Sequence, residues 1–152
     1  MLEIVKPSLK DIPTMQKLIE PEVVSGIILD RSDNEVANAI RSYILAKEGD
    51  VIYGYCALHI HTLQIAEIRS LIIVPKYRGQ GVGARIVQEA LNEALSLGVE
   101  EVLTLTYEAE FFKKLGFIEI PKESIPEQKI WLDCIKCKHF PICNEVSLIK
   151  KL

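Results

Sequence analysis

The chain has no long hydrophobic segment, no large excess of charge of either sign, and few cysteines. No apolar run reaches the roughly 18 residues that a bilayer-spanning helix requires. The first residues, Met1–Lys6, lack the charged and then apolar arrangement of a secretory signal peptide. With 18 basic and 21 acidic residues the net charge is −3, which gives no general attraction to nucleic acid or an anionic membrane. We therefore expect a cytoplasmic protein that binds neither.

The chain also lacks internal repeats and low-complexity linkers. Its 152 residues suit one domain, and a hydrophobic content of 49% is enough to bury a core without disulfides. We expect a single domain over residues 1–152. Its C-terminal extension, at about 121–152, differs in composition, because the lone tryptophan and three of the four cysteines fall there.

The most informative segment is an apolar strand that runs into a glycine-rich loop and then into an amphipathic helix. The loop has glycine at positions 79, 81 and 83. Glycines at this density let backbone N–H groups point into one concavity, and the helix start adds the positive end of its dipole. The result is a cradle for an anion of pyrophosphate size. No Lys-Ser or Lys-Thr pair follows Gly83, which argues against a nucleotide P-loop.

The pattern Arg78-x-x-Gly81-x-Gly83 resembles the acetyl-CoA motif of the GNAT superfamily of N-acetyltransferases. A second landmark, the run AEFFKKLGF at 109–117, follows at the spacing seen in that family. A merely glycine-rich turn would not explain this second landmark. The resemblance covers about residues 3–120 and implies an α/β fold, a mixed central sheet flanked by helices, with acetyl-CoA as cosubstrate.

Hydrophobic periodicity and turn residues predict the order of the elements. Strands are expected at 3–5, 43–46, 51–60, 65–74, 101–107, 117–120 and 145–149, and helices at 11–19, 32–42, 84–97 and 108–115. Asp11 is expected to cap the first helix, Pro21 to end it, and Gly98 to cap the third in a left-handed conformation. In the GNAT fold, the strand before the loop and the strand after the third helix diverge, and the gap holds the thioester end of the cofactor.

The resemblance also assigns a cofactor site. Backbone N–H groups of the loop would bind the pyrophosphate, and the end of the preceding strand would hydrogen-bond the pantetheine arm as an added strand does. The expected cofactor residues are Leu71, Ile72, Ile73, Val74, Arg78, Gly79, Gln80, Gly81, Val82, Gly83, Ala84, Phe111 and Lys114.

Acetyl transfer to an amine requires a base, an oxyanion donor and release of a thiolate. Strict strand alternation predicts four side chains on one face: Glu67, Arg69, Leu71 and Ile73. Glu67 is the candidate base, directly or through water. The alternative is a structural carboxylate paired with Arg69. A backbone N–H of Ile72 or Ile73 would stabilise the oxyanion.

The acid for the leaving group is less obvious. Many GNAT enzymes carry a tyrosine just before the Leu-Gly-Phe landmark, where this chain has Phe112. Tyr107, at the end of the preceding strand, is the candidate acid, with a packing role as the alternative. A thiol is also acidic enough to leave directly as thiolate.

The segment 66–83 further resembles the acetyltransferase domain of N-acetylglutamate synthases, with Arg69-Ser70 as the distinguishing pair. This implies a small-molecule amine acceptor, L-glutamate, and a role in arginine biosynthesis. Since arginine can grip a carboxylate with two hydrogen bonds, Arg69 and Arg31 are the expected substrate residues. The alternatives are another amine, such as a polyamine or a protein N-terminus, and a non-catalytic acyl-CoA sensor.

Long N-acetylglutamate synthases carry an amino-acid-kinase-like domain that this sequence does not show, so we expect a short form without feedback control seated in such a domain. A homodimer is compatible with the pattern, with the last strand as a candidate interface.

Three cysteines and a histidine near the C-terminus have ligand-like spacing: Cys134, Cys137, His139 and Cys143. A second close pair is missing, so reduced thiols, a metal site and a redox disulfide remain alternatives, and no metal is assigned. Cys56 is expected in the core. His59 and His61 alternate onto one strand face, either beside the acceptor or as half-exposed strand residues.

Overall fold

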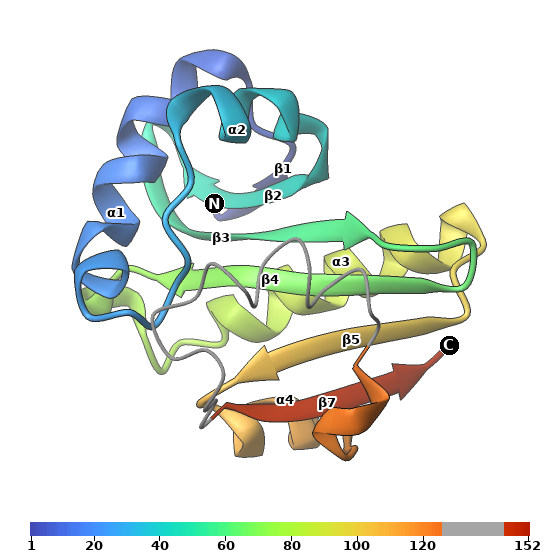
Figure 1. Ribbon diagram of the computed structural model, residues 1–152. Helices are drawn as coiled ribbons and strands as arrows, with labels where there is room; N and C mark the ends of the chain where they lie inside the picture. Colours follow the sequence, from blue (N-terminus) through green and yellow to red (C-terminus); the bar gives the residue numbers. More distant parts are fainter. Residues whose placement is uncertain (126–144) are drawn as a thin grey trace.

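The computed structural model describes residues 1–125 and 145–152. A mixed seven-stranded sheet in the order β1-β2-β3-β4-β5-β7-β6 forms its centre (Figure 1). Every neighbouring pair is antiparallel except β4 and β5. The strands are Glu3–Val5 (β1), Tyr43–Glu48 (β2), Val51–Ile60 (β3), Ile65–Ile73 (β4), Glu101–Thr106 (β5), Ile118–Glu119 (β6) and Val146–Lys151 (β7). This is the mixed α/β sheet that the sequence predicts.

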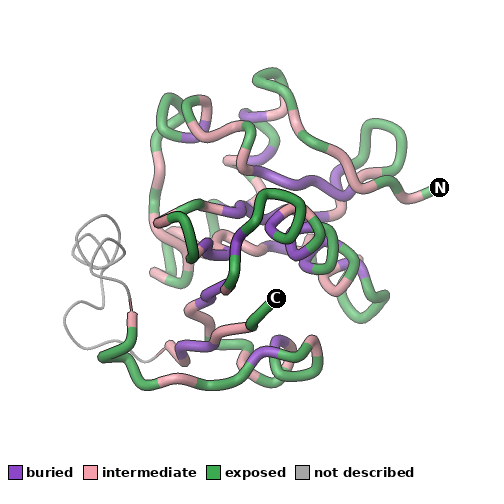
Figure 2. Tube along the Cα trace, turned by 90° about the vertical axis from the view of Figure 1, so that its right-hand side faces the viewer, coloured by how far each residue is buried: buried purple, intermediate pink, exposed green. Residues whose placement is uncertain are grey.

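Helices cover both faces of the sheet and give it two cores. On one face, α3 (Val82–Leu97) packs over β1 to β4, and α4 (Ala109–Lys114) packs over β6 and β7 at the edge of the sheet. On the other, α1 (Ile12–Val24) and α2 (Asp33–Asn38) cover β2, β3 and the end of β4. Figure 2 shows the buried stretches running along the strands, with exposed residues at the turns and on the outer side of the helices.

The ends of the helices follow local sequence signals, with two exceptions at the two ends of α1. Ser32 and Glu35 form the capping box at the start of α2, and Gly98 ends α3 with φ +88°, as predicted. Asp11 does not cap α1 with its side chain, because its Oδ2 accepts the backbone N–H of Ser8 at 2.8 Å. Pro21 does not end α1 either. The helix continues to Val24, and the N–H of Ser25 donates to the Pro21 carbonyl at 3.0 Å.

Burial explains why α1 passes through its proline. The side chains of Ile12, Met15 and Ile19 are buried in the second core. The hydroxyl of Tyr55 on β3 also donates to the Met15 carbonyl at 2.9 Å. A proline removes one backbone hydrogen bond from a helix, and this packing holds α1 on the sheet despite that loss.

A β-bulge in β4 reverses the alternation predicted for this strand. Ser70 has φ +57°, the one positive φ among non-glycine residues of the described part, and the β3–β4 register shifts beside it. The extra residue changes which face the later side chains take. Glu67 and Arg69 therefore share the α1 face, whereas Leu71 and Ile73 pack into the core under α3. The prediction that all four lie on one face is wrong.

Candidate active site

The candidate site begins where β4 and β5 part. Their parallel ladder joins only Ile65–Glu67 to Glu101–Leu103. Just beyond it, the Thr104 hydroxyl donates to the carbonyl of Ile68 at 3.0 Å. The arrowheads of the two strands then lie apart in Figure 1. The divergence implied by the family resemblance is present, and we use the word opening for the gap between the two backbones beyond this ladder.

The backbone of β4 alternates across this opening. The N–H of Val74 donates to the carbonyl of Tyr53 on β3, at 2.9 Å. Since backbone polar groups point alternately to the two sides of a strand, those of Leu71 and Ile73 face the opening and those of Ile72 face β3. Of the two predicted oxyanion donors, the Ile73 N–H is thus the one directed toward the opening.

The glycine-rich loop lies at the end of β4, after a short 3₁₀ turn at Pro75–Tyr77. Gly79 and Gly81 have φ of +78° and +79°, and Gly81 is the N-cap of α3. The first N–H groups of a helix have no partner within it, so the start of α3 presents donors here. A Cβ on Gly83 would lie 3.2 Å from Phe111 Cζ, so the first turn of α3 lies close against α4. The fold thus brings the two sequence landmarks together.

Arg78 is directed back toward the sheet. Its Nε donates to the carbonyl of Ile73 at 3.0 Å, and its Nη2 lies 3.7 Å from Glu22 Oε1 on α1. The guanidinium therefore links the loop to the end of β4 and to α1. Sequence reasoning missed Glu22, since nothing in the local pattern relates α1 to the loop. It also missed the stack of Tyr53 on β3 against Tyr77 in the 3₁₀ turn, whose ring centroids lie 3.7 Å apart.

Glu67 lies at the last ladder position before the strands part, with only 1% of its surface exposed. Its Oε1 is 2.8 Å from Nε2 of His61, which follows β3. The structure thus pairs the carboxylate with His61, a contact that the sequence did not predict. The His61 side chain is buried just after β3, and is not the half-exposed strand residue that is one of its two predicted roles. Arg69 lies further along β4 on the same face, opposite Ala57.

The remaining predicted residues come from other elements of the fold. Phe112, at the position where the family often has tyrosine, is buried and packs edge-on against Phe111 and Phe117. Tyr107 follows β5 and is 42% exposed, so it is accessible from solvent. Lys114 is the exposed last residue of α4. Arg31 precedes α2, and its carbonyl accepts the Gln16 side-chain amide at 2.7 Å.

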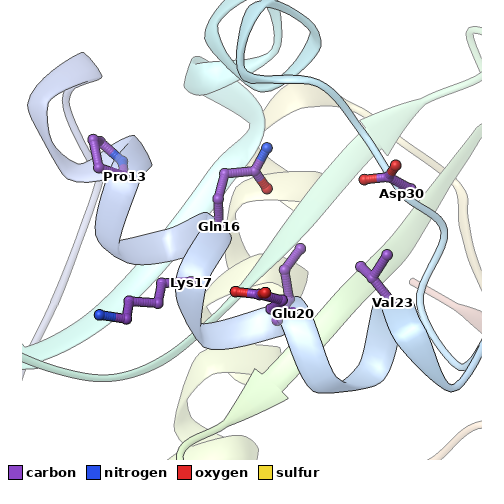
Figure 3. Close-up of a pocket in the computed structure, with 7 residues that line it drawn as sticks. Pro13, Gln16, Lys17, Glu20, Val23 and Asp30 are labelled. Atoms are coloured by element: carbon purple, nitrogen blue, oxygen red, sulfur yellow. The ribbon is translucent and has the colours of Figure 1, made fainter.

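A surface hollow of about 320 Å³ lies along α1, on the side that faces the segment before α2 (Figure 3). It is lined by Pro13, Gln16, Lys17, Ile19, Glu20, Val23 and Asp30. None of the predicted catalytic or cofactor residues is among them. The hollow therefore lies apart from the opening between β4 and β5.

The candidate metal ligands of the sequence lie near the C-terminus. Within residues 1–125 and 145–152, no cluster of three or more His, Cys, Asp or Glu side chains could hold a metal ion. Cys134, Cys137, His139 and Cys143 lie outside the described residues.

Cys56 is buried in the core as predicted, and burial raises the pKa of its thiol to about 12. In the described part of the chain, no helix combines the length and apolar character needed to cross a membrane.

The loop geometry predicts a difference between two glycine variants. Gly81 and Gly49 both have positive φ, and a Cβ at either would have no neighbour within 4 Å. Replacement by alanine should cost each about 1–2 kcal/mol of stability. Only Gly81→Ala should weaken coenzyme A binding, by about tenfold, because its methyl group enters the anion cradle. Calorimetric titration of both variants tests this, and equal affinities would contradict the placement of the cradle.

Comparison with known proteins agrees with this geometry. The model of the acetyltransferase (GNAT) family matches residues 9–117. An uncharacterized N-acetyltransferase of Chlorobaculum tepidum is 36% identical over 144 residues, which are 95% of this chain and 92% of that protein. An amino-acid acetyltransferase of Mycobacterium tuberculosis is 31% identical over 113 residues, 72% of this chain and 64% of that protein. The chain spans 28% of a similar amino-acid acetyltransferase of Neisseria meningitidis.

Two solved structures share the fold. N-acetylglutamate synthase from Neisseria gonorrhoeae, complexed with coenzyme A and N-acetyl-glutamate, superposes with a TM-score of 0.87 at 24% identity, over all of this chain and 35% of that one. Rv2747 from Mycobacterium tuberculosis, in a complex that includes CoA, gives a TM-score of 0.85 at 24% identity, over 99% of each chain. The predicted fold and acetyltransferase class are confirmed, and the chain belongs to the acetyltransferase (GNAT) family.

Proposed function

We propose that this protein transfers the acetyl group of acetyl-CoA to the α-amino group of L-glutamate, a step of arginine biosynthesis. The observation that carries the proposal is the placement of Glu67 and Arg69 on one face of β4, beside the opening between β4 and β5. A base and a carboxylate-binding cation are the two groups that an amino-acid acceptor needs. Relatives named amino-acid acetyltransferase, and a neighbouring structure that holds N-acetyl-glutamate, support this choice.

Acetyl-CoA fits the site through the loop and the edge of β4. The N–H groups at the start of α3, from Val82 to Ala84, receive the pyrophosphate, while Gly79 and Gly81 keep the approach open. The backbone groups of Leu71 pair with the pantetheine arm along the opening. The Ile73 carbonyl already accepts from Arg78 Nε, and the Ile73 N–H is directed at the thioester carbonyl. Phe111 forms the α4 side of this site, beside Gly83.

The groups around the opening supply the steps of acetyl transfer. An ammonium group must first lose a proton, because α-amino groups titrate near pH 8. Glu67 accepts that proton, and the amine attacks the thioester carbonyl carbon. The Ile73 N–H stabilises the oxyanion, a contribution of about 3–4 kcal/mol for a well-placed donor. The C–S bond then breaks with its electron pair on sulfur, and the thiolate leaves directly or takes a proton from Tyr107. The nitrogen loses its second proton in this collapse, to solvent or to the Tyr107 phenolate, so that a neutral amide and free coenzyme A are formed.

Arg69 and Arg31 bind the two carboxylates of the acceptor. Replacing Arg69 with glutamine should raise the KM for L-glutamate about 10- to 100-fold, because charge-assisted hydrogen bonds to a carboxylate are lost. The KM for acetyl-CoA should not change. Arg41→Gln, at an exposed arginine in the 3₁₀ turn Ile40–Ser42, is the matched control and should behave as wild type. An unchanged KM for glutamate in Arg69→Gln would remove Arg69 from the acceptor site.

A thiol-release assay with acetyl-CoA and a panel of amino acids, polyamines and short peptides tests the proposed acceptor. Selective turnover of L-glutamate is the expected result. Turnover of a different amine would retain the cofactor site and discard glutamate. Coenzyme A binding without turnover of any amine would favour a sensor, a reading consistent with the buried Phe112.

A further inference from the structure

We propose, building on the function proposed above, that His61 is a positioning residue for Glu67. Its ring holds the carboxylate at the point where β4 and β5 part, in the orientation that proton abstraction needs. The two side chains form a buried pair, with 0% of the His61 side chain and 2% of the Glu67 side chain exposed. The distance from Nε2 to Oε1 is 2.8 Å.

The β3–β4 hairpin fixes the place of this histidine. The N–H of His61 donates to the carbonyl of Ile65 at 2.9 Å, which closes the turn. Inside the turn, the Thr62 hydroxyl accepts the N–H groups of Gln64 and Ile65. The ring of His59, which lies opposite Glu67 in the ladder, contacts the His61 ring edge-on with centroids 4.7 Å apart. Both the backbone and the ring of His61 are thus held in place.

The surroundings of the ring determine which nitrogen carries the proton. His61 Nδ1 is buried and has no hydrogen-bond partner among the described residues. An unpaired buried N–H is rarer in proteins than an under-satisfied acceptor, so we assign the lone pair to Nδ1 and the proton to Nε2. Nε2–H then donates to Oε1, and Glu67 is the acceptor.

The proton balance of the step leaves His61 unchanged. One ammonium proton of the acceptor moves to the Glu67 carboxylate, and the freed nitrogen lone pair forms the new bond to the acetyl carbon as the C–S bond breaks with its electron pair on sulfur. The second nitrogen proton passes to solvent or to the group that protonated the thiolate. His61 neither gains nor loses a proton. Its contribution is to limit the rotation of the carboxylate, since misplaced reacting groups lower turnover even where binding is intact.

Two variants separate this role from simple packing. His61→Leu fills similar space without a donor, whereas His61→Gln can place an amide N–H near the position of Nε2. We expect His61→Leu to lower kcat about 10- to 100-fold with an unchanged KM for acetyl-CoA. The kcat of His61→Gln should stay within about fivefold of the wild-type value. Thermal unfolding and coenzyme A binding, measured on both, report whether the fold and the cofactor site are intact. Equal kcat values for the two folded variants would overturn the proposal.

A double-mutant cycle gives the decisive readout, because a residue that acts through another has no effect once that residue is removed. In a Glu67→Gln background, His61→Leu should cause no further loss of kcat. Additive losses would show that His61 acts independently and would overturn the proposal. If Glu67→Gln has a reduced kcat but His61→Leu has a wild-type kcat, the proposal for His61 is overturned and Glu67 remains the base. Absence of acetyl transfer by the unmodified protein, with coenzyme A still bound, would instead refute the proposed function itself.

Discussion

Glu67→Gln is expected to lower kcat for acetyl transfer roughly 100- to 1000-fold, the range for loss of a positioned general base. The amide is nearly isosteric with the carboxylate and still accepts a hydrogen bond from His61, but it cannot take a proton from the acceptor ammonium. Because Glu67 lies on the face of β4 opposite Leu71 and Ile73, coenzyme A affinity should remain within about twofold of wild type. Steady-state kinetics and calorimetric titration measure the two quantities.

A surface glutamate supplies the control for this variant. Glu89→Gln makes the same chemical change on the exposed side of α3 and should leave kcat unchanged. If Glu67→Gln folds, binds coenzyme A and turns over at the wild-type rate, then Glu67 is a structural carboxylate and the base is another group or water. A parallel loss of kcat and thermal stability would instead assign Glu67 a role in folding.

Gly54→Ala is expected to produce the largest loss of stability, about 3 kcal/mol or more, since overpacking that displaces backbone exceeds the usual cost of an added methyl group. A Cβ at this position would overlap the carbonyl oxygen of Ile72, and would lie 2.7 Å from Ile73 Cδ1 and 3.1 Å from Ile73 Cα. Two of these contacts are backbone atoms of β4, which cannot move without disturbing the β3–β4 ladder. Chemical denaturation measures the loss.

The matched variant for this prediction is Gly49→Ala, at the β2–β3 turn. There the added methyl group meets nothing within 4 Å, and the cost is only that of the left-handed backbone, about 1–2 kcal/mol. Because Ile73 also carries the proposed oxyanion donor, any Gly54→Ala protein that folds should have a reduced kcat as well. Equal stability of the two variants would mean that β3 and β4 are less closely packed than the structure indicates.

The sequence predicted those parts of the site that depend on local backbone chemistry. Gly79, Gly81 and Gly98 occupy left-handed conformations that favour glycine, so the loop and the end of α3 could be placed from residue types alone. The capping box of Ser32 and Glu35 is equally local. The succession of strands along the chain was predictable because turn residues separate them in the sequence.

The features that the sequence missed depend on contacts between distant segments. Ser70 takes a left-handed conformation that its residue type does not favour, and the resulting bulge reverses the faces of β4. The link between Arg78 and Glu22 joins a loop to a helix far away in the chain. The pairing of His61 with Glu67 follows from the hairpin register, which alternation within one strand cannot give.

The most direct test of the account is to identify the product that the purified protein forms from acetyl-CoA and L-glutamate. Mass spectrometry of the reaction should show glutamate carrying one acetyl group on its α-nitrogen, formed in step with free coenzyme A and lost in Glu67→Gln. Coenzyme A release without acetylated glutamate, or an acetyl group found only on another amine, would contradict the account.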